Sequence, residues 1–116
     1  YGSVIFMIGD LGSGKTTFTK GFAAGLGFSN NIQSPTYPIL NEYSDSNKFI
    51  YHFDFYRLKS VSVFLEIGGI DYLSDNNGIC IIEWPELIES FDIDQKIKIF
   101  FRENNDKNSR TIEVYR

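Results

Sequence analysis

Two short runs that are apolar almost throughout stand out in the hydropathy pattern, at positions 3–8 and 79–82. Both are rich in β-branched or aromatic side chains, and neither alternates with polar residues. This pattern is typical of strands that are buried on both faces of a sheet. We therefore predict that the two runs form central strands of an α/β fold.

A helical period follows the first run. Phe18, Phe22 and Leu26 recur at every fourth position, which predicts a helix over residues 17–26 with one apolar face. Glycine suits the left-handed conformation that often ends a helix, so we expect the helix to stop near Gly25 and Gly27.

Shorter helices are predicted in two further segments. Residues 61–74 have helical spacing that is interrupted at Gly68 and Gly69, so a single long helix is not expected. Pro85 follows the second apolar run and suits the first turn of a helix, which predicts a helix over residues 85–90.

Four more strands complete the pattern. Residues 39–43 and 48–54 are strand-like and are joined by the turn-forming sequence Ser-Asp-Ser-Asn at 44–47, which predicts a hairpin. Residues 96–102 and 110–115 predict a second pair of strands.

The segment between the first predicted strand and its helix carries a nucleotide-binding motif. Residues 9–16 read Gly-Asp-Leu-Gly-Ser-Gly-Lys-Thr, a complete G-x-x-x-x-G-K-[ST] phosphate loop. Its glycines permit a tight turn that aims backbone N–H groups at a polyphosphate beside a helix N-terminus. Lys15 is expected to reach the β- and γ-phosphates, and the Thr16 hydroxyl to bind Mg²⁺. The predicted cofactor-binding residues of this segment are Asp10, Leu11, Gly12, Ser13, Gly14, Lys15, Thr16 and Thr17.

Two carboxylates come directly after strand-like runs. In an open α/β sheet, ligands bind beyond the carboxyl ends of the parallel strands, so these acids are expected beside the phosphate loop. Glu83 follows four apolar residues, as a Walker B acid does, and is predicted to hold Mg²⁺ directly or through water. Asp54 is predicted to orient the attacking water or a metal-bound water. The catalytic candidates are therefore Lys15, Asp54 and Glu83.

Three other residues near this edge have two interpretations each. Thr36 could sense the γ-phosphate or Mg²⁺, as switch threonines do, or could cap a turn beside Pro35. Trp84 could pack on a nucleotide or a partner, or could belong to the core. His52 shares a strand face with Asp54, and we interpret it as a structural hydrogen-bonding residue in preference to a general base.

Composition narrows the choice of function. The chain of 116 residues suits one domain, 1–116, and its net charge of −4 argues against gripping DNA or RNA unaided. Cys80 is the one cysteine and lies in an apolar run, so we expect a buried, inert thiol and no internal disulfide. No apolar stretch is long enough to span a membrane, and the first residues lack the basic region of a signal peptide. We expect a cytoplasmic location.

Four sequence elements occur together in a combination that is far more specific than the phosphate loop alone. They are the phosphate loop with its following threonine at 9–17, Ser-Pro-Thr-Tyr at 34–37, His-Phe-Asp-Phe-Tyr-Arg-Leu at 52–58 and Ile-Glu-Trp-Pro at 82–85. This set resembles the bacterial TsaE (YjeE) family, the P-loop ATPases required for threonylcarbamoyladenosine modification of tRNA.

The resemblance implies an α/β/α sandwich of the P-loop NTPase type, with a mixed, mainly parallel central sheet and an antiparallel C-terminal pair. It also implies an enzyme that binds ATP or ADP with Mg²⁺, hydrolyses ATP slowly by itself and works with a TsaB–TsaD-like heterodimer. In that family TsaD modifies the adenosine at position thirty-seven of tRNA, and the ATP cycle of TsaE resets the machinery. The family's nucleotide and metal roles fall on Lys15, Thr16 and Glu83, and its essential carboxylate falls on Asp54. The tRNA is then held through the partner complex.

The chain departs from the family at its beginning. Family members usually carry a helix and a strand before the phosphate-loop strand, whereas this chain starts almost at that strand. We therefore expect a shortened chain whose sheet lacks an edge.

Two other functions are compatible with a phosphate loop. A small-molecule kinase needs a lid of cations, but between the predicted helix and the C-terminal strands the only cations are Lys48, Arg57 and Lys59. A non-catalytic nucleotide sensor would use ATP binding alone to dock a partner. The presence of both candidate carboxylates argues mildly against the sensor.

Overall fold

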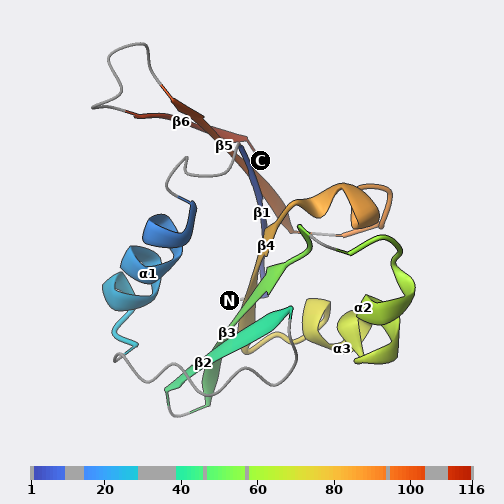
Figure 1. Ribbon diagram of the computed structural model, residues 1–116. Coiled ribbons are helices and arrows are strands. Elements are labelled where there is room, and N and C mark those ends of the chain that lie inside the picture. Colours follow the sequence, from blue (N-terminus) through green and yellow to red (C-terminus); the bar gives the residue numbers. More distant parts are fainter. Residues whose placement is uncertain are drawn as a thin grey trace.

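The computed structural model describes residues 2–9, 15–28, 39–45, 47–56, 58–93, 95–103 and 110–115. The strands are β1 (Val4–Ile8), β2 (Leu40–Asp45), β3 (Lys48–Asp54), β4 (Gly78–Glu83), β5 (Lys96–Glu103) and β6 (Arg110–Tyr115). The helices are α1 (Lys15–Gly25), α2 (Ser62–Glu66), α3 (Gly69–Leu73) and the 3₁₀ helix η1 (Pro85–Ile88). The strands form one sheet with helices on both faces (Figure 1).

The sheet is mixed and mostly parallel. Its strand order is β2-β3-β4-β1-β5-β6. The four inner strands, β3, β4, β1 and β5, run parallel, while β2 pairs antiparallel with β3 at one edge and β6 pairs antiparallel with β5 at the other. The predicted α/β class, the β2–β3 hairpin and the antiparallel C-terminal pair are confirmed.

Alternate side chains of the central strands build two hydrophobic clusters, one on each face of the sheet. The cluster on the α1 face includes Ile5, Met7, Ala23, Ile81 and Ile99. The cluster on the opposite face, which α2 and η1 cover, includes Phe6, Phe53, Phe64, Ile82 and Ile88. Because both faces are covered, β4 is buried along its whole length and β1 is buried except at its last residue. The prediction that the two apolar runs are central strands is confirmed.

Helix α1 ends in a Schellman motif. Gly27 has a φ of +88°, its N–H donates to the Ala24 carbonyl, and the N–H of Phe28 donates to the Ala23 carbonyl, both at 3.0 Å. Ala23 and Phe28 are buried in the same cluster, which supplies the hydrophobic contact of the motif. The predicted end of the helix is therefore confirmed, while the helix begins at Lys15, two residues earlier than expected.

The short helices follow the prediction in part. Helices α2 and α3 are separated at Gly68, whose φ is +85°. The segment after Pro85 is a 3₁₀ helix that ends at Ile88, so the prediction of a helix through Ser90 was wrong. A 3₁₀ helix has three residues per turn, which places Pro85 and Ile88 on one side, and both are buried.

Candidate functional site

The carboxyl ends of β1, β3 and β4 meet at one end of the sheet, where the parallel strands finish, which we call the carboxyl edge. Asp54 and Glu83 are the last residues of β3 and β4 and are direct partners in the parallel register. Glu83 is also the register partner of Met7 in β1. Register partners of neighbouring strands point to the same face, so both acids lie on the face that α1 covers. The structure thus brings the two predicted carboxylates together.

The first turns of α1 pack over the end of β1 on this same face. The Thr19 hydroxyl lies 3.8 Å from the sulfur of Met7, and Thr19 is buried. Strand β1 ends at Ile8 and α1 begins at Lys15. The N-terminus of α1, with backbone N–H groups that have no acceptor within the helix, therefore lies at the edge that carries Glu83.

The remaining predicted nucleotide-binding residues can be placed only in part. Asp10, Leu11, Gly12, Ser13, Gly14 and Thr36 lie outside the described residues. For Lys15, Thr16 and Thr17 the structure describes a helical backbone only. Their roles stay predictions.

Glu83 is a buried carboxylate with a histidine partner. Glu83 is 5% exposed, and its Oε2 lies 2.6 Å from Nε2 of His52, which is 7% exposed. A carboxylate oxygen accepts hydrogen bonds, so with Glu83 as a carboxylate the donor in this contact is Nε2–H of His52. This agrees with the interpretation of His52 as a structural hydrogen-bonding residue. Sequence reasoning missed the partner, because the contact depends on the register between β3 and β4.

Asp54, in contrast, is exposed. Its Oδ1 accepts from the backbone N–H of Tyr56 at 3.0 Å, and its own backbone N–H donates to the Ile39 carbonyl at 2.9 Å. The first contact is an Asx-type turn, which restricts the orientation of the carboxylate at the end of the strand. Asp54 is therefore held in place and accessible to water.

The residue after Glu83 turns the chain sharply. Trp84 has a φ of 58° and a ψ of 60°, the left-handed conformation, which is uncommon for a bulky side chain. Its ring lies 5.0 Å from the ring of Tyr56, and it packs against the cluster on the face opposite α1. Of the two interpretations of Trp84, these contacts favour core packing.

The residues present fit a magnesium ion that is shared with a nucleotide. Among the described residues, no group of three or more His, Cys, Asp or Glu side chains could hold a metal by itself. Mg²⁺ in such sites usually takes one or two carboxylates, together with phosphate oxygens and water. Glu83 supplies an oxygen donor of this kind, at the edge where α1 begins.

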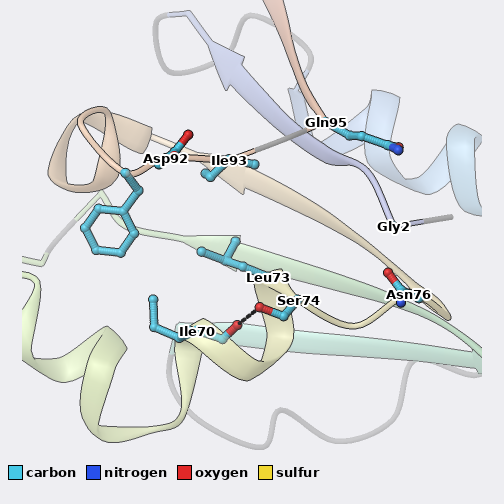
Figure 2. A pocket seen from close by; sticks show the side chains of 9 residues that line it. Gly2, Ile70, Leu73, Ser74, Asn76, Asp92, Ile93 and Gln95 are labelled. Atoms are coloured by element: carbon cyan, nitrogen blue, oxygen red, sulfur yellow. Dashed lines mark hydrogen bonds between the residues drawn. The ribbon is translucent and has the colours of Figure 1, made fainter.

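A cavity of about 500 Å³ lies at the other end of the sheet, where the parallel strands begin (Figure 2). Gly2, Asn76 and Gln95, which precede β1, β4 and β5, contribute to its lining, together with Leu73 of α3. Because the parallel strands begin at this end, the cavity is remote from Asp54 and Glu83. We therefore do not assign it to the nucleotide.

Cys80 is buried in β4, and burial, with a smaller contribution from Asp75, raises the pKa of its thiol to about 12. Its Sγ donates to the Tyr72 carbonyl at 3.2 Å. The prediction that Cys80 is buried is confirmed, and its pKa favours the unreactive thiol form.

In the part of the chain that the structure covers, no helix is long and apolar enough to cross a membrane.

Comparisons with known proteins agree with these observations. Residues 1–112 match the family model of threonylcarbamoyl adenosine biosynthesis protein TsaE. The tRNA threonylcarbamoyladenosine biosynthesis protein TsaE of Bacillus subtilis is 42% identical over 105 residues, which cover 90% of this chain and 65% of that protein. The protein of the same name from Haemophilus influenzae is 46% identical over 83 residues, which cover 72% of this chain and 52% of the relative.

The fold is similar to a solved structure as well. The crystal structure of Bacillus subtilis YdiB matches with a TM-score of 0.69 and 37% sequence identity, over 95% of this chain and 65% of that one. The chain thus spans about half to two thirds of the length of the relatives that it matches.

Proposed function

The chain belongs to the TsaE family, as the match over residues 1–112 shows, and on that premise we propose that it binds Mg²⁺ with ATP and hydrolyses ATP in support of tRNA threonylcarbamoyladenosine modification. One observation carries this proposal: Asp54 and Glu83 are register partners at the edge where β1 leads into α1. We propose that residues 1–116 act as a single P-loop ATPase domain.

The phosphate loop supplies the nucleotide contacts in this proposal. Residues 9–14 lie between the end of β1 and the first turn of α1, and we propose that this segment and the helix N-terminus offer backbone N–H groups to the phosphates. Lys15 contacts the β- and γ-phosphates. The other assigned residues are Asp10, Leu11, Gly12, Ser13, Gly14, Thr16, Thr17 and Thr36.

The two carboxylates take different parts in hydrolysis. Glu83 and the Thr16 hydroxyl hold Mg²⁺, which when bound neutralises charge on the phosphate oxygens. Asp54, held by its turn and open to solvent, accepts a hydrogen bond from the attacking water and orients it. Buried Glu83 is suited to a fixed ligand, and exposed Asp54 is suited to a water contact.

The pathway role of the chain requires partners. We propose that a TsaB–TsaD-like heterodimer holds the tRNA and that ATP turnover by this chain resets that complex in the cytoplasm. Support comes from the relatives, whose names place them in tRNA threonylcarbamoyladenosine biosynthesis, and from the net charge of −4, which is unsuited to holding tRNA directly.

Substitution of the candidate residues tests the proposal through nucleotide binding and ATP turnover, each measured with and without the partner pair. Lys15→Ala should lose most nucleotide affinity.

Glu83→Ala should bind ATP without Mg²⁺ as the parent does and lose turnover by roughly 100-fold or more, the usual scale for removing one charge-stabilising group. Asp54→Asn should bind ATP nearly normally and fail in turnover. Glu86→Ala is the matched control, because Glu86 is an exposed acid close to Glu83 in the sequence.

Three results would contradict the proposal. Parental turnover by Glu83→Ala would refute the metal assignment, and equal loss of binding and turnover in Asp54→Asn would indicate a structural role. Transfer of phosphate to a small molecule instead of water would identify a kinase.

A further inference from the structure

His52 is a buried polar group at the candidate site to which the proposed chemistry gives no task. It is 7% exposed, and its Nε2 lies 2.6 Å from Oε2 of Glu83. Burying a histidine and a carboxylate costs free energy unless the two satisfy each other.

The backbone holds both partners rigidly. His52 is in register with Ile81, so Glu83 lies two positions further along the neighbouring strand on the same face. The ladder continues past the strands, because the N–H of Phe55 donates to the Glu83 carbonyl at 3.1 Å. Only the side-chain torsions of Glu83 remain to be fixed, and the contact with His52 fixes them.

The contact also makes the two carboxylate oxygens of Glu83 different from each other. Oε2 is engaged by His52, and among the described residues His52 is the one side chain that hydrogen-bonds Glu83. Oε1 therefore remains as the oxygen that can serve as a metal ligand. Mg²⁺ requires nearly ideal octahedral geometry, which one oriented oxygen serves better than a carboxylate that rotates freely.

We propose that His52 is a positioning residue for magnesium: its Nε2–H holds Oε2 of Glu83 and thereby presents Oε1 to the ion. The inference rests on the proposed function, because it takes Glu83 as a magnesium ligand. Outer-shell partners of this kind typically change metal affinity by about 10- to 100-fold.

The test compares three substitutions on β3. His52→Leu removes the donor, His52→Gln keeps an N–H donor on its ε nitrogen, and Tyr51→Phe is the matched control. Tyr51 is also 7% exposed, but it belongs to the cluster on the other face, where its hydroxyl donates to Asp75.

The measurements separate positioning from folding. The melting temperature of each variant is measured without metal, and its ADP affinity is measured without Mg²⁺. The ADP affinity is then followed as Mg²⁺ is added, which gives the Mg²⁺ concentration at which half of the increase in affinity is reached. We expect His52→Leu to raise that concentration about 10-fold or more, His52→Gln to remain within about threefold of the parent, and Tyr51→Phe to be unchanged. ADP affinity without Mg²⁺ should be the same in all four proteins.

The single histidine offers a second measurement on the unsubstituted, untagged chain. The imidazole ¹⁵N signals should show a proton on Nε2 without metal, and they should shift when Mg²⁺ is added with ADP but not with ADP alone. If His52→Leu does not fold, this measurement still tests the positioning role of His52. Imidazole signals that do not shift when Mg²⁺ is added with ADP would overturn the proposal.

Other outcomes are equally decisive. A parental Mg²⁺ requirement in His52→Leu overturns the proposal, as does a loss in His52→Gln equal to that in His52→Leu when both melt like the parent. If Glu83→Ala leaves the Mg²⁺ requirement unchanged, the metal role in the proposed function fails and this inference fails with it. If Glu83→Ala raises the requirement and His52→Leu does not, only the positioning role is lost.

Discussion

At the scale of single residues, burial differs between the two acids that follow strand-like runs in the sequence. Asp54 and Glu83 are both acids at strand ends and are direct register partners. Glu83 is 5% exposed and is compensated by a histidine, whereas Asp54 is solvated and is held by a backbone N–H. A buried carboxylate needs a partner and an exposed one does not, so the two acids lie in different environments.

Burial also sets the behaviour of Cys80. The pKa of its thiol is raised from 9.0 to about 12, mainly by burial. The thiolate is the nucleophile, and the raised pKa lowers its fraction at pH 8, so the folded chain should be alkylated by iodoacetamide on the order of 1,000-fold more slowly than the chain in urea.

The same shift predicts a dependence of stability on pH. Because the pKa is higher in the folded state, the contribution of Cys80 to stability is complete below pH 9 and is lost as the pH rises towards 12. Urea unfolding from pH 8 to pH 11 should show this decline, and Cys80→Ala should reduce it. Rapid native alkylation, or an equally steep decline in Cys80→Ala, would contradict the prediction.

At the scale of the elements, sequence patterns predicted what depends on local sequence. The apolar runs of β1 and β4, the β2–β3 hairpin and the end of α1 near Gly25 and Gly27 each depend on neighbouring residues, and all agree with the structure. The carboxyl ends of β3 and β4 were also predicted to meet, because parallel neighbours end at one edge.

The features that could not be predicted depend on contacts between distant segments. The length of η1 follows from burial of Ile88 against the sheet, and the left-handed turn at Trp84 accompanies contact with Tyr56. The pairing of His52 with Glu83 requires the register of two strands. None of these contacts is encoded in a short window of sequence.

The close packing of α2 on α3 gives a prediction for two glycines. A Cβ atom at Gly69 would lie 2.4 Å from ring atoms of Phe64, which is fully buried. Gly69→Ala should therefore destabilise the fold by about 1–3 kcal/mol, the usual cost of overpacking.

Gly21 is the matched control, because nothing lies within 4 Å of a Cβ built there. Gly21→Ala in the middle of α1 should stabilise by up to about 1 kcal/mol. Urea unfolding of both variants measures the two free energies. Equal effects of the two substitutions would show that α2 and α3 do not pack as described.

At the scale of the whole molecule, the two edges of the sheet are distinct. The end of β1 and the start of α1 lie at the carboxyl ends of the parallel strands (Figure 1), where the register also places the two acids. The cavity beside Gly2 lies where these strands begin (Figure 2). The site is therefore assembled from three segments that are far apart in the sequence.

Nucleotide binding at the carboxyl edge should stabilise the whole fold. A ligand that binds only the folded state adds about 2.7 kcal/mol when its concentration is 100 times its dissociation constant. ADP with Mg²⁺ should accordingly raise the melting temperature of the chain, as measured by calorimetry, and Lys15→Ala should abolish the rise. A similar rise in Lys15→Ala would place the nucleotide elsewhere.

The position of β1 in the sheet has a consequence for synthesis. Met7 pairs with Glu83 on one side and with Ile99 on the other, so β1 is completed by strands that are made much later. Such long-range pairing folds slowly, because a large loop must close before its contacts form. On the ribosome, the β2–β3 hairpin can form early, whereas the described neighbours of β1 are not complete until β4 and β5 have been made. The chain should acquire its affinity for nucleotide only after β5 has been made.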